Sequence, residues 1–258
     1  MTHSGALVLR LLSAVPAGGT PVDGITGLCR DAEHKARYWF FGGGTALLYD
    51  MADDAVVRPA APLDRYWPHL AGTLFARGAD TCYTTYHTPH GYHWFFAGDQ
   101  VVQYDSVAGV VLQGPCAVGD LFRFSGAAAE FARGVDAVCP PGPQDGLFWF
   151  FRKGRALQYD TRAGRVTLPV QPLAAYWPGL SGTVFADGVD ACHTTAHAPG
   201  GRHWLFAHGQ TALYDSGEHR VLHGPAPFAD LFPILREDLL RPPPTRHFPA
   251  EPAGRSST

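Results

Sequence analysis

Two stretches of the chain, 110 residues apart, carry histidine and aromatic side chains of the kind that bind metals and planar molecules. The candidate ligand-binding residues in and beside them are Tyr83, Tyr86, His87, His90, His193 and His197. A neutral imidazole is a ligand for haem iron or a transition metal, and neighbouring rings offer a flat surface to a planar ligand. The alternative is that His93 and His203 are ordinary strand residues and that the other histidines are solvated loop side chains.

Standard enzyme motifs are absent from the sequence. It contains no Gly-x-Ser-x-Gly nucleophile motif, no His-Glu-x-x-His zinc motif and no glycine-rich phosphate-binding motif. Their absence does not exclude catalysis, because tyrosine and histidine at the mouth of a pocket can promote a cyclisation or a proton transfer without a standard triad.

A fourfold repeat must position these residues. Each copy has an aromatic strand, a two-residue turn such as Gly43-Gly44, and a second strand that ends in Tyr-Asp. A single four-stranded sheet with two apolar faces is not stable alone, and four such units bury both faces by stacking around an axis. The sequence therefore predicts an all-β, four-bladed propeller with a short helix between blades and a central tunnel. The tryptophans that mark the copies, 55 positions apart, are Trp39, Trp94, Trp149 and Trp204.

A second periodicity, of 110 residues, makes alternate copies the closer relatives. Tyr66-Trp67-Pro68 matches Tyr176-Trp177-Pro178, and the residues around Cys82 match those around Cys192. We expect residues 1–20 to form a leader, in which 6–15 is an additional strand or short helix over the domain. We expect residues 236–258 to be a disordered, proline-rich tail. The propeller is predicted at 21–235, with blades at 21–73, 74–130, 131–183 and 184–235.

The cysteines number five, which excludes complete intramolecular pairing. Four thiols around an axis would suit a tetrahedral zinc ion. However, Cys82 and Cys192 lie one strand position earlier, relative to the preceding Asp, than Cys139 does. Alternation along a strand then points the two pairs to opposite faces. We predict that Cys29, Cys82, Cys139 and Cys192 are buried as small apolar residues, with a metal site or disulfides as the alternatives.

Composition limits the partners of the protein. The net charge is −3, and two of the twenty basic residues are lysines, so the basic surface that nucleic acid or an anionic membrane requires is not expected. The apolar run at residues 6–15 contains Arg10, is a poor signal peptide and is too short to span a bilayer. We expect a soluble monomer or homodimer that binds a small molecule, with the cytoplasm slightly favoured and the compartment otherwise open.

The repeats resemble those of the haemopexin family over residues 21–235. The resemblance rests on Val135-Asp136-Ala137, Val189-Asp190-Ala191, Phe150-Phe151-Arg152-Lys153-Gly154-Arg155 and Trp177-Pro178-Gly179-Leu180. It implies a four-bladed propeller around a narrow axial tunnel, similar to the free-standing propellers of seed albumins and microbial relatives. Two departures are that no cysteine follows Cys192 to tie blade 4 to blade 1, and that Thr26 stands where the other copies have Asp.

The resemblance also implies a cation, calcium or sodium, in the tunnel. Converging carbonyl dipoles suit a hard cation. The main-chain oxygens would come from Thr26, Asp80, Asp136 and Asp190. The alternative is that the aspartates only fix the start of each blade by accepting hydrogen bonds from backbone N–H groups.

Three functions are compatible with this sequence. The first is a small-ligand-binding protein that takes haem or a polyamine, as the resemblance implies, at the mouth of the propeller. The second is a cofactor-free biosynthetic enzyme, a cyclase, pericyclase or proton-transfer catalyst, in which His87, His193, His197 or Tyr83 acts as acid or base. The third is an adhesive surface for a protein partner.

Overall fold

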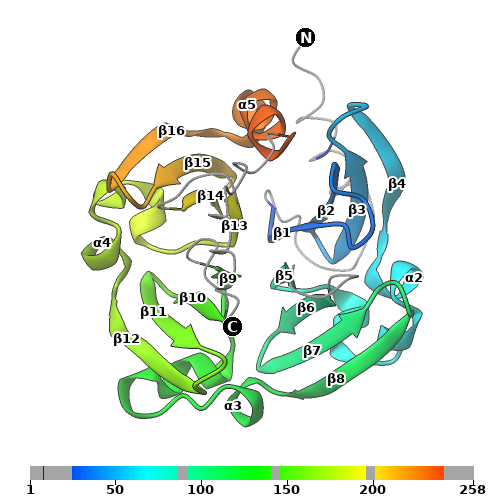
Figure 1. Cartoon of the computed structure of the whole chain (residues 1–258), viewed down its shortest axis with the longest axis horizontal. Helices are drawn as coiled ribbons and strands as arrows, with labels where there is room; N and C mark the ends of the chain where they lie inside the picture. Colours follow the sequence, from blue (N-terminus) through cyan, green and yellow to red (C-terminus); the bar gives the residue numbers. More distant parts are fainter. Residues whose placement is uncertain (1–7, 9–24, 86–91, 141–145, 196–200, 241–258) are drawn as a thin grey trace, which may run out of the picture.

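The protein is a four-bladed β-propeller, as predicted. The computed structural model describes residues 8, 25–85, 92–140, 146–195 and 201–240. Four antiparallel sheets of four strands are arranged around a common centre, with the first strand of each sheet innermost (Figure 1). Each sheet keeps the order of the sequence, so every blade is a simple meander from the axis to the rim.

The strands of the four blades have closely matched lengths. Blade 1 consists of β1 (Gly27–Arg30), β2 (Arg37–Gly42), β3 (Thr45–Asp50) and β4 (Ala55–Pro62). Blade 2 consists of β5 (Thr81–Thr85), β6 (Tyr92–Ala97), β7 (Gln100–Asp105) and β8 (Val110–Ala117). Blade 3 consists of β9 (Ala137–Cys139), β10 (Leu147–Arg152), β11 (Arg155–Asp160) and β12 (Arg165–Pro172). Blade 4 consists of β13 (Ala191–Thr195), β14 (Arg202–Ala207), β15 (Gln210–Asp215) and β16 (Arg220–Pro227).

Short helices connect the blades. They are α2 (Leu63–Tyr66), η1 (Pro68–Leu70) and η2 (Leu74–Arg77) after blade 1, and α3 (Val118–Leu121) and η3 (Gly126–Arg133) after blade 2. Blade 3 is followed by α4 (Leu173–Tyr176), η4 (Pro178–Leu180) and η5 (Val184–Ala186). These segments match the single helical turns that the sequence predicts. No helix of the described residues is long and apolar enough to cross a membrane.

The last helix differs from the prediction. Helix α5 (Phe228–Leu240) is 13 residues long and continues past the predicted end of the propeller at residue 235. Its residues Phe228, Phe232 and Leu235 pack into the cluster that joins blades 4 and 1, which also contains Val8. Figure 1 shows α5 between these two blades. The helix therefore covers the junction where the two ends of the propeller meet.

The repeated turn residues have the conformations that the hairpins require. Lys153 and Gly154 both have positive φ, 48° and 69°, as in a type I′ turn, whose twist matches that of the flanking strands. The aspartate of each Tyr-Asp pair accepts hydrogen bonds from two backbone N–H groups of the next turn; for Asp50 these come from Ala52 and Asp53. The repeat thus specifies both turns of each blade.

Hydrophobic cores lie at the four junctions between neighbouring blades. Each core combines the facing sides of two sheets, so both faces of every blade are covered. The four tyrosines of the Tyr-Asp pairs are at most 2% exposed. This arrangement confirms the physical reason for the ring, which is that no sheet could bury both faces alone.

Candidate functional site

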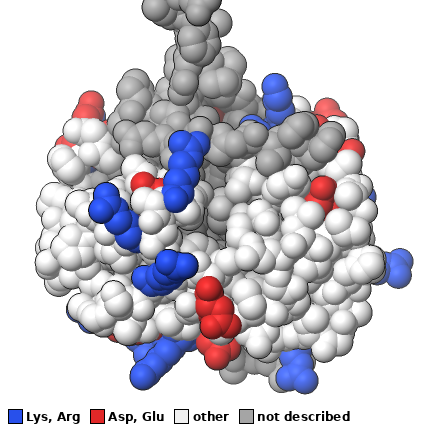
Figure 2. All heavy atoms as spheres, turned by 60° about the horizontal axis from the view of Figure 1, so that its bottom comes forward, with Lys and Arg blue, Asp and Glu red and all other residues white. Residues whose placement is uncertain are grey.

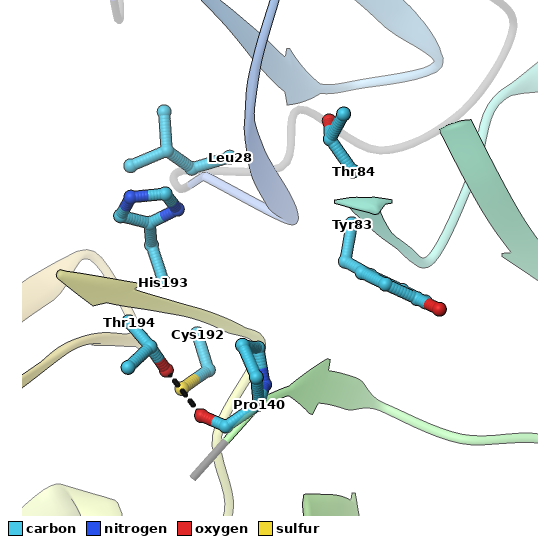
Figure 3. A pocket seen from close by; sticks show the side chains of 7 residues that line it. All are labelled: Leu28, Tyr83, Thr84, Pro140, Cys192, His193 and Thr194. Atoms are coloured by element: carbon cyan, nitrogen blue, oxygen red, sulfur yellow. Dashed lines mark hydrogen bonds between the residues drawn. The ribbon is translucent and has the colours of Figure 1, made fainter. Parts of the chain in front are cut away.

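The innermost strands of all four blades meet around a small axial cavity. It is lined by Leu28, Tyr83, Thr84, Pro140, Cys192, His193 and Thr194 (Figure 3). Thr194 donates a hydrogen bond to the carbonyl oxygen of Pro140 at 2.5 Å, which joins blades 4 and 3 across it. The cavity volume is about 10 Å³, enough for one water molecule. A ligand of the size of haem does not fit inside it.

The predicted histidine site is only partly placed by the structure. Tyr86, His87, His90 and His197 lie outside the described residues. His193 and Tyr83 both line the axial cavity, but Figure 3 shows the ring of Tyr83 directed away from His193. His93 and His203 are buried in their strands, in agreement with the alternative interpretation of these two residues.

His193 and Tyr83 are not tuned for acid–base chemistry near neutral pH. Burial lowers the pKa of His193 to about 3, and the positive charge of Arg30 adds to this effect. The edge of its ring lies against Tyr38, with centroids 5.4 Å apart. Burial also raises the pKa of the Tyr83 hydroxyl. Because an efficient general acid or base has a pKa near the working pH, neither residue suits that role.

A much larger cleft opens between blades 2 and 3. Its volume is about 700 Å³, within the range of small-molecule sites. Its walls contain the rings of Tyr83, Trp94, Phe122 and Phe148, and its polar residues include Gln103, Gln113, Arg123 and Arg162. No carboxylate side chain is among the described residues that line it. In Figure 2, where the bottom of Figure 1 comes forward, both basic and acidic side chains lie around the centre of the face.

The cleft lies where the helix after blade 2 has no ring to cover the tryptophan and, unlike blade 4, no longer helix to replace that ring. In blade 1, Tyr66 covers Trp39 with ring centroids 5.0 Å apart, and in blade 3, Tyr176 covers Trp149 at 5.1 Å. The corresponding residue after blade 2 is Leu121, which has no ring. As a result Trp94 is only half-buried, whereas Trp39, Trp149 and Trp204 are at most 8% exposed.

Aromatic stacking and an unpaired donor characterise the exposed tryptophan. The ring of Tyr83 is parallel to that of Trp94, with centroids 6.3 Å apart, and also contacts Phe148 at 4.7 Å. The indole Nε1 of Trp94 is buried without a hydrogen-bond partner among the described residues. In blade 4 the equivalent Nε1 of Trp204 donates to the carboxylate of Asp238 at 2.8 Å. The structure thus identifies Trp94 as a candidate ligand-binding residue that the sequence analysis did not propose.

The axial aspartates fix the start of each blade by accepting hydrogen bonds from its own β-hairpin. Asp80 accepts from Gly98 N–H at 2.6 Å, Asp136 from Lys153 N–H at 2.6 Å, and Asp190 from His208 N–H at 2.9 Å. This is the role given by the alternative interpretation, with each partner supplied by the β-hairpin of the same blade. Thr26 instead donates from its hydroxyl to Ala79 O at 3.3 Å.

Electrostatics at this end of the axis favours a cation. Burial, and then the negative charges of Asp190 and Asp80, raise the pKa of Asp136, while Lys153 N–H and Arg152 oppose the shift. The three carboxylates are not part of a group whose ligand atoms lie within 4.8 Å, among the described residues. An ion at this end, which the family resemblance implies, would therefore be held by main-chain oxygens, with the carboxylates supplying longer-range attraction.

The cysteines form two pairs rather than one set of four. Cys139 and Cys192 are joined by a disulfide across the junction of blades 3 and 4, and Cys29 and Cys82 are buried free thiols in the core of blades 1 and 2. The prediction of four unreacted cysteines is therefore wrong for one pair. Cys139 and Cys192 do lie on opposite faces of their respective sheets, as strand alternation predicts. Because the two sheets belong to neighbouring blades, these faces meet at the junction and the sulfurs come together.

The disulfide also bears on a metal site. Ligand atoms of Cys139, Cys192 and His203 lie within 4.8 Å of one another. While the two sulfurs are bonded to each other, neither is available as a thiolate, so this group would bind a soft cation only after reduction.

Comparison with solved structures identifies the architecture. The structure of hemopexin-fold protein CP4 from cow pea superposes with a TM-score of 0.68 and 20% identity, over 83% of this chain and 97% of that one. The seed albumin LS24 from Lathyrus sativus gives 0.71 and 18%, over 85% and 99%. The chain has the haemopexin fold. A further haemopexin-fold neighbour is a plant lectin with two metal-binding sites from Cicer arietinum, at 0.69 and 21%, over 83% and 97%.

The haemopexin fold is what these likenesses establish, because the identities are all below 25%. No protein-family model and no curated protein sequence matches the chain. The function is therefore argued from the residues of this chain.

Proposed function

We propose that this haemopexin-fold protein binds a small, planar, anionic ligand in the cleft between blades 2 and 3, at the mouth of the propeller. The cleft lies beside Thr85 and Gly146, where β5 ends and β10 is about to begin. The observation that carries the proposal is Trp94, because it is the least buried of four equivalent tryptophans and lines a cleft of ligand size.

The chemistry of the cleft favours an anion. Arg123 and Arg162 supply positive charge, and guanidinium groups pair well with carboxylates. The ring of Trp94 lines the cleft and offers its surface to a flat ligand, while its Nε1 is buried and not accessible from the cleft. Of the two ligands suggested by the family resemblance, haem has a flat ring for Trp94 and Tyr83 and carboxylates for the arginines. A polyamine would be repelled by the arginines.

Titration with hemin tests the proposal. We expect saturable quenching of tryptophan fluorescence that is lost in Trp94→Phe. Binding should weaken about tenfold or more in Arg123→Gln/Arg162→Gln, since each charge-assisted hydrogen bond contributes roughly 1.5–3 kcal/mol. Arg65→Gln/Arg77→Gln, which removes the same charge from blade 1's connecting helices, is the matched control and should bind normally.

Two further measurements separate the alternatives. Spermine should produce no heat of binding in calorimetry; tight spermine binding would contradict the anionic ligand. A Soret shift that disappears in His87→Ala/His197→Ala would indicate axial histidine ligation. Equal hemin affinity in the wild type, the Trp94 variant and the arginine variant would refute the cleft as the site.

We also propose a structural cation at the axial end, held by main-chain oxygens of Thr26, Asp80, Asp136 and Asp190. Its support is the mutual repulsion of the three carboxylates, which a bound cation would relieve. Calcium at millimolar concentration should raise the melting temperature of protein first treated with a chelator. An unchanged melting temperature with both calcium and sodium would exclude the ion.

A further inference from the structure

Two equivalent clusters of two cysteines and one histidine lie at opposite junctions of the propeller. One contains Cys139, Cys192 and His203, and the other contains Cys29, Cys82 and His93, each exactly 110 positions earlier in the sequence. The strand register is the same in both. Cys29 pairs with Trp39 and Cys139 with Trp149, while Cys82 pairs with Phe95 and Cys192 with Leu205.

The two clusters differ in oxidation state. Cys139 and Cys192 form a disulfide with a Cα–Cα distance of 5.7 Å, within the range that a disulfide spans without backbone movement. Cys29 and Cys82 are free, each 1% exposed, and belong to the same core cluster between blades 1 and 2. Because the backbone frame is equivalent to that of the disulfide, the second pair is also placed for a covalent bond.

We propose that Cys29 and Cys82 are a redox-active pair, which a hydroperoxide converts into a second disulfide between blades 1 and 2. Cys29 first gives its thiol proton to His93. The resulting thiolate attacks one oxygen of the peroxide, the O–O bond breaks, and Cys29 becomes a sulfenic acid. The released hydroxide takes a proton from His93. The sulfur of Cys82 then attacks that of Cys29, and the hydroxyl leaves with the Cys82 proton as water. In total, two thiols and one hydrogen peroxide give one disulfide and two waters.

His93 distinguishes Cys29 as the attacking sulfur. Its ring is held on both sides, by Ser106 Oγ at 2.5 Å from Nδ1 and by Arg30 O at 3.3 Å from Nε2, and Cys29 is close enough to raise the pKa of His93. Burial raises the pKa of Cys29, but the hydrogen bond with Cys82 and the charge of His93 outweigh it and lower the pKa to about 6. The carboxylate of Asp31 also acts on His93 and favours its protonated form.

Access selects a small oxidant. Both cysteines are 1% exposed, and neither lines the axial cavity of about 10 Å³, although Thr84 on β5 does. Burial of this degree favours a molecule near the size of water, such as hydrogen peroxide, over a bulky thiol reagent. Oxidation of a buried pair would add a second covalent link between blades, separated in sequence by 53 residues as in the existing one.

Peptide mapping of the full chain tests the proposal. The native protein is treated with one equivalent of hydrogen peroxide, quenched with catalase, denatured and alkylated. We expect a peptide that links Cys29 to Cys82 and a rise in melting temperature of roughly 5–10 °C. Cys116, which lies outside both clusters, should remain alkylatable, and Cys116→Ser should behave as the wild type.

Variants separate the roles of the residues. Cys82→Ser should accumulate a sulfenic acid on Cys29 that dimedone traps, and Cys29→Ser should not react. In His93→Gln the rate at pH 7 should fall roughly tenfold and should rise up to about pH 9, whereas the wild-type rate levels off near pH 7.

Two results would overturn the proposal. In the first, Cys29 and Cys82 stay free while Cys116 is oxidised. In the second, native mass spectrometry finds a metal ion that leaves only when both thiols are alkylated. Because the wild-type reaction requires no substitution, the test holds even for variants that fold poorly.

Discussion

Leu121→Tyr should close the cleft by copying a residue that two other blades already use. Tyr66 and Tyr176 occupy the equivalent position and lie 5.0 and 5.1 Å from Trp39 and Trp149. An aromatic pair of this kind is worth about 1 kcal/mol beyond the area it buries. For a domain of this size, that corresponds to a rise in melting temperature of roughly 2–4 °C.

The same substitution should remove ligand binding. A tyrosine at position 121 would occupy the space against Trp94 in which we place the flat face of the ligand. Loss of that stacking, worth about 1.4 kcal/mol or more, weakens binding at least about tenfold. The assay is hemin titration followed by tryptophan fluorescence, with calorimetric melting of the same samples.

Tyr176→Leu is the matched control, because it makes the reverse change at another junction. It removes the ring from Trp149 and also the hydrogen bond from the Tyr176 hydroxyl to Pro169 O at 2.5 Å. We expect a loss of about 2 kcal/mol of stability with hemin affinity unchanged. A folded Leu121→Tyr protein that binds hemin as tightly as the wild type would refute both the cleft as the site and the argument from its missing ring.

Three other predictions concern stability. Asp238→Leu should lower the free energy of unfolding by about 1–3 kcal/mol in denaturant titrations, because the buried Nε1 of Trp204 loses its acceptor; Asp238→Asn, which keeps an acceptor, should lose less. Cys139→Ser/Cys192→Ser should cost about 2–4 kcal/mol by the same measurement, and an unchanged midpoint would show that the disulfide does not form. Burial lowers the pKa of His193 and His203 to about 3, so the unfolded chain binds protons at these sites below its ordinary pKa of 6.5 while the folded chain does not. Stability should therefore fall as the pH drops from 6.5 towards 3, by up to about 1.4 kcal/mol per pH unit for each histidine, and His203→Gln should flatten this slope.

The fold could be predicted because its determinants are local and repeated. The spacing of Trp39, Trp94, Trp149 and Trp204 locates the second strand of each blade, and pairs such as Lys153-Gly154 locate the turn that follows. Neither requires knowledge of distant contacts. The ring follows from the need to cover both faces of each sheet, which is a property of the pattern alone.

The full length of helix α5 was not predicted because nearby prolines indicate a helix end, whereas packing against the core stabilises a longer helix. Pro233 and the Pro-rich segment after residue 241 indicate a helix end. Yet Phe228, Leu231, Phe232, Leu235 and Leu239 recur at helical spacing, and all are buried. The core between blades 4 and 1 supplies the apolar surface that stabilises the helix despite the lost hydrogen bond at Pro233.

The cysteine pairing required a geometric step beyond strand alternation. Two residues on opposite faces of one sheet are far apart. Two residues on opposite faces of neighbouring sheets can instead meet at the junction between the blades. The sequence therefore indicated the orientation of Cys139 and Cys192 and not their contact. The cleft could in principle have been predicted, because Leu121 stands where the helices after blades 1 and 3 have tyrosine. Whether the tryptophan below it is covered, however, depends on which segment packs above it, and the sequence does not show this.

What packs above each tryptophan decides where this propeller can accept a ligand. Blade 4 resembles blade 2 at this position, with Leu231-Phe232 corresponding to Leu121-Phe122. Trp204 is nevertheless 0% exposed, because α5 continues across it and Asp238 accepts its Nε1 hydrogen bond. The helix after blade 2, α3, has leucine at the equivalent position but ends there, at Leu121, and so does not continue across Trp94 as α5 continues across Trp204. A flat ligand in the cleft would cover the ring of Trp94 as α5 covers that of Trp204, so the chain itself contains an example of the covered tryptophan proposed for its site.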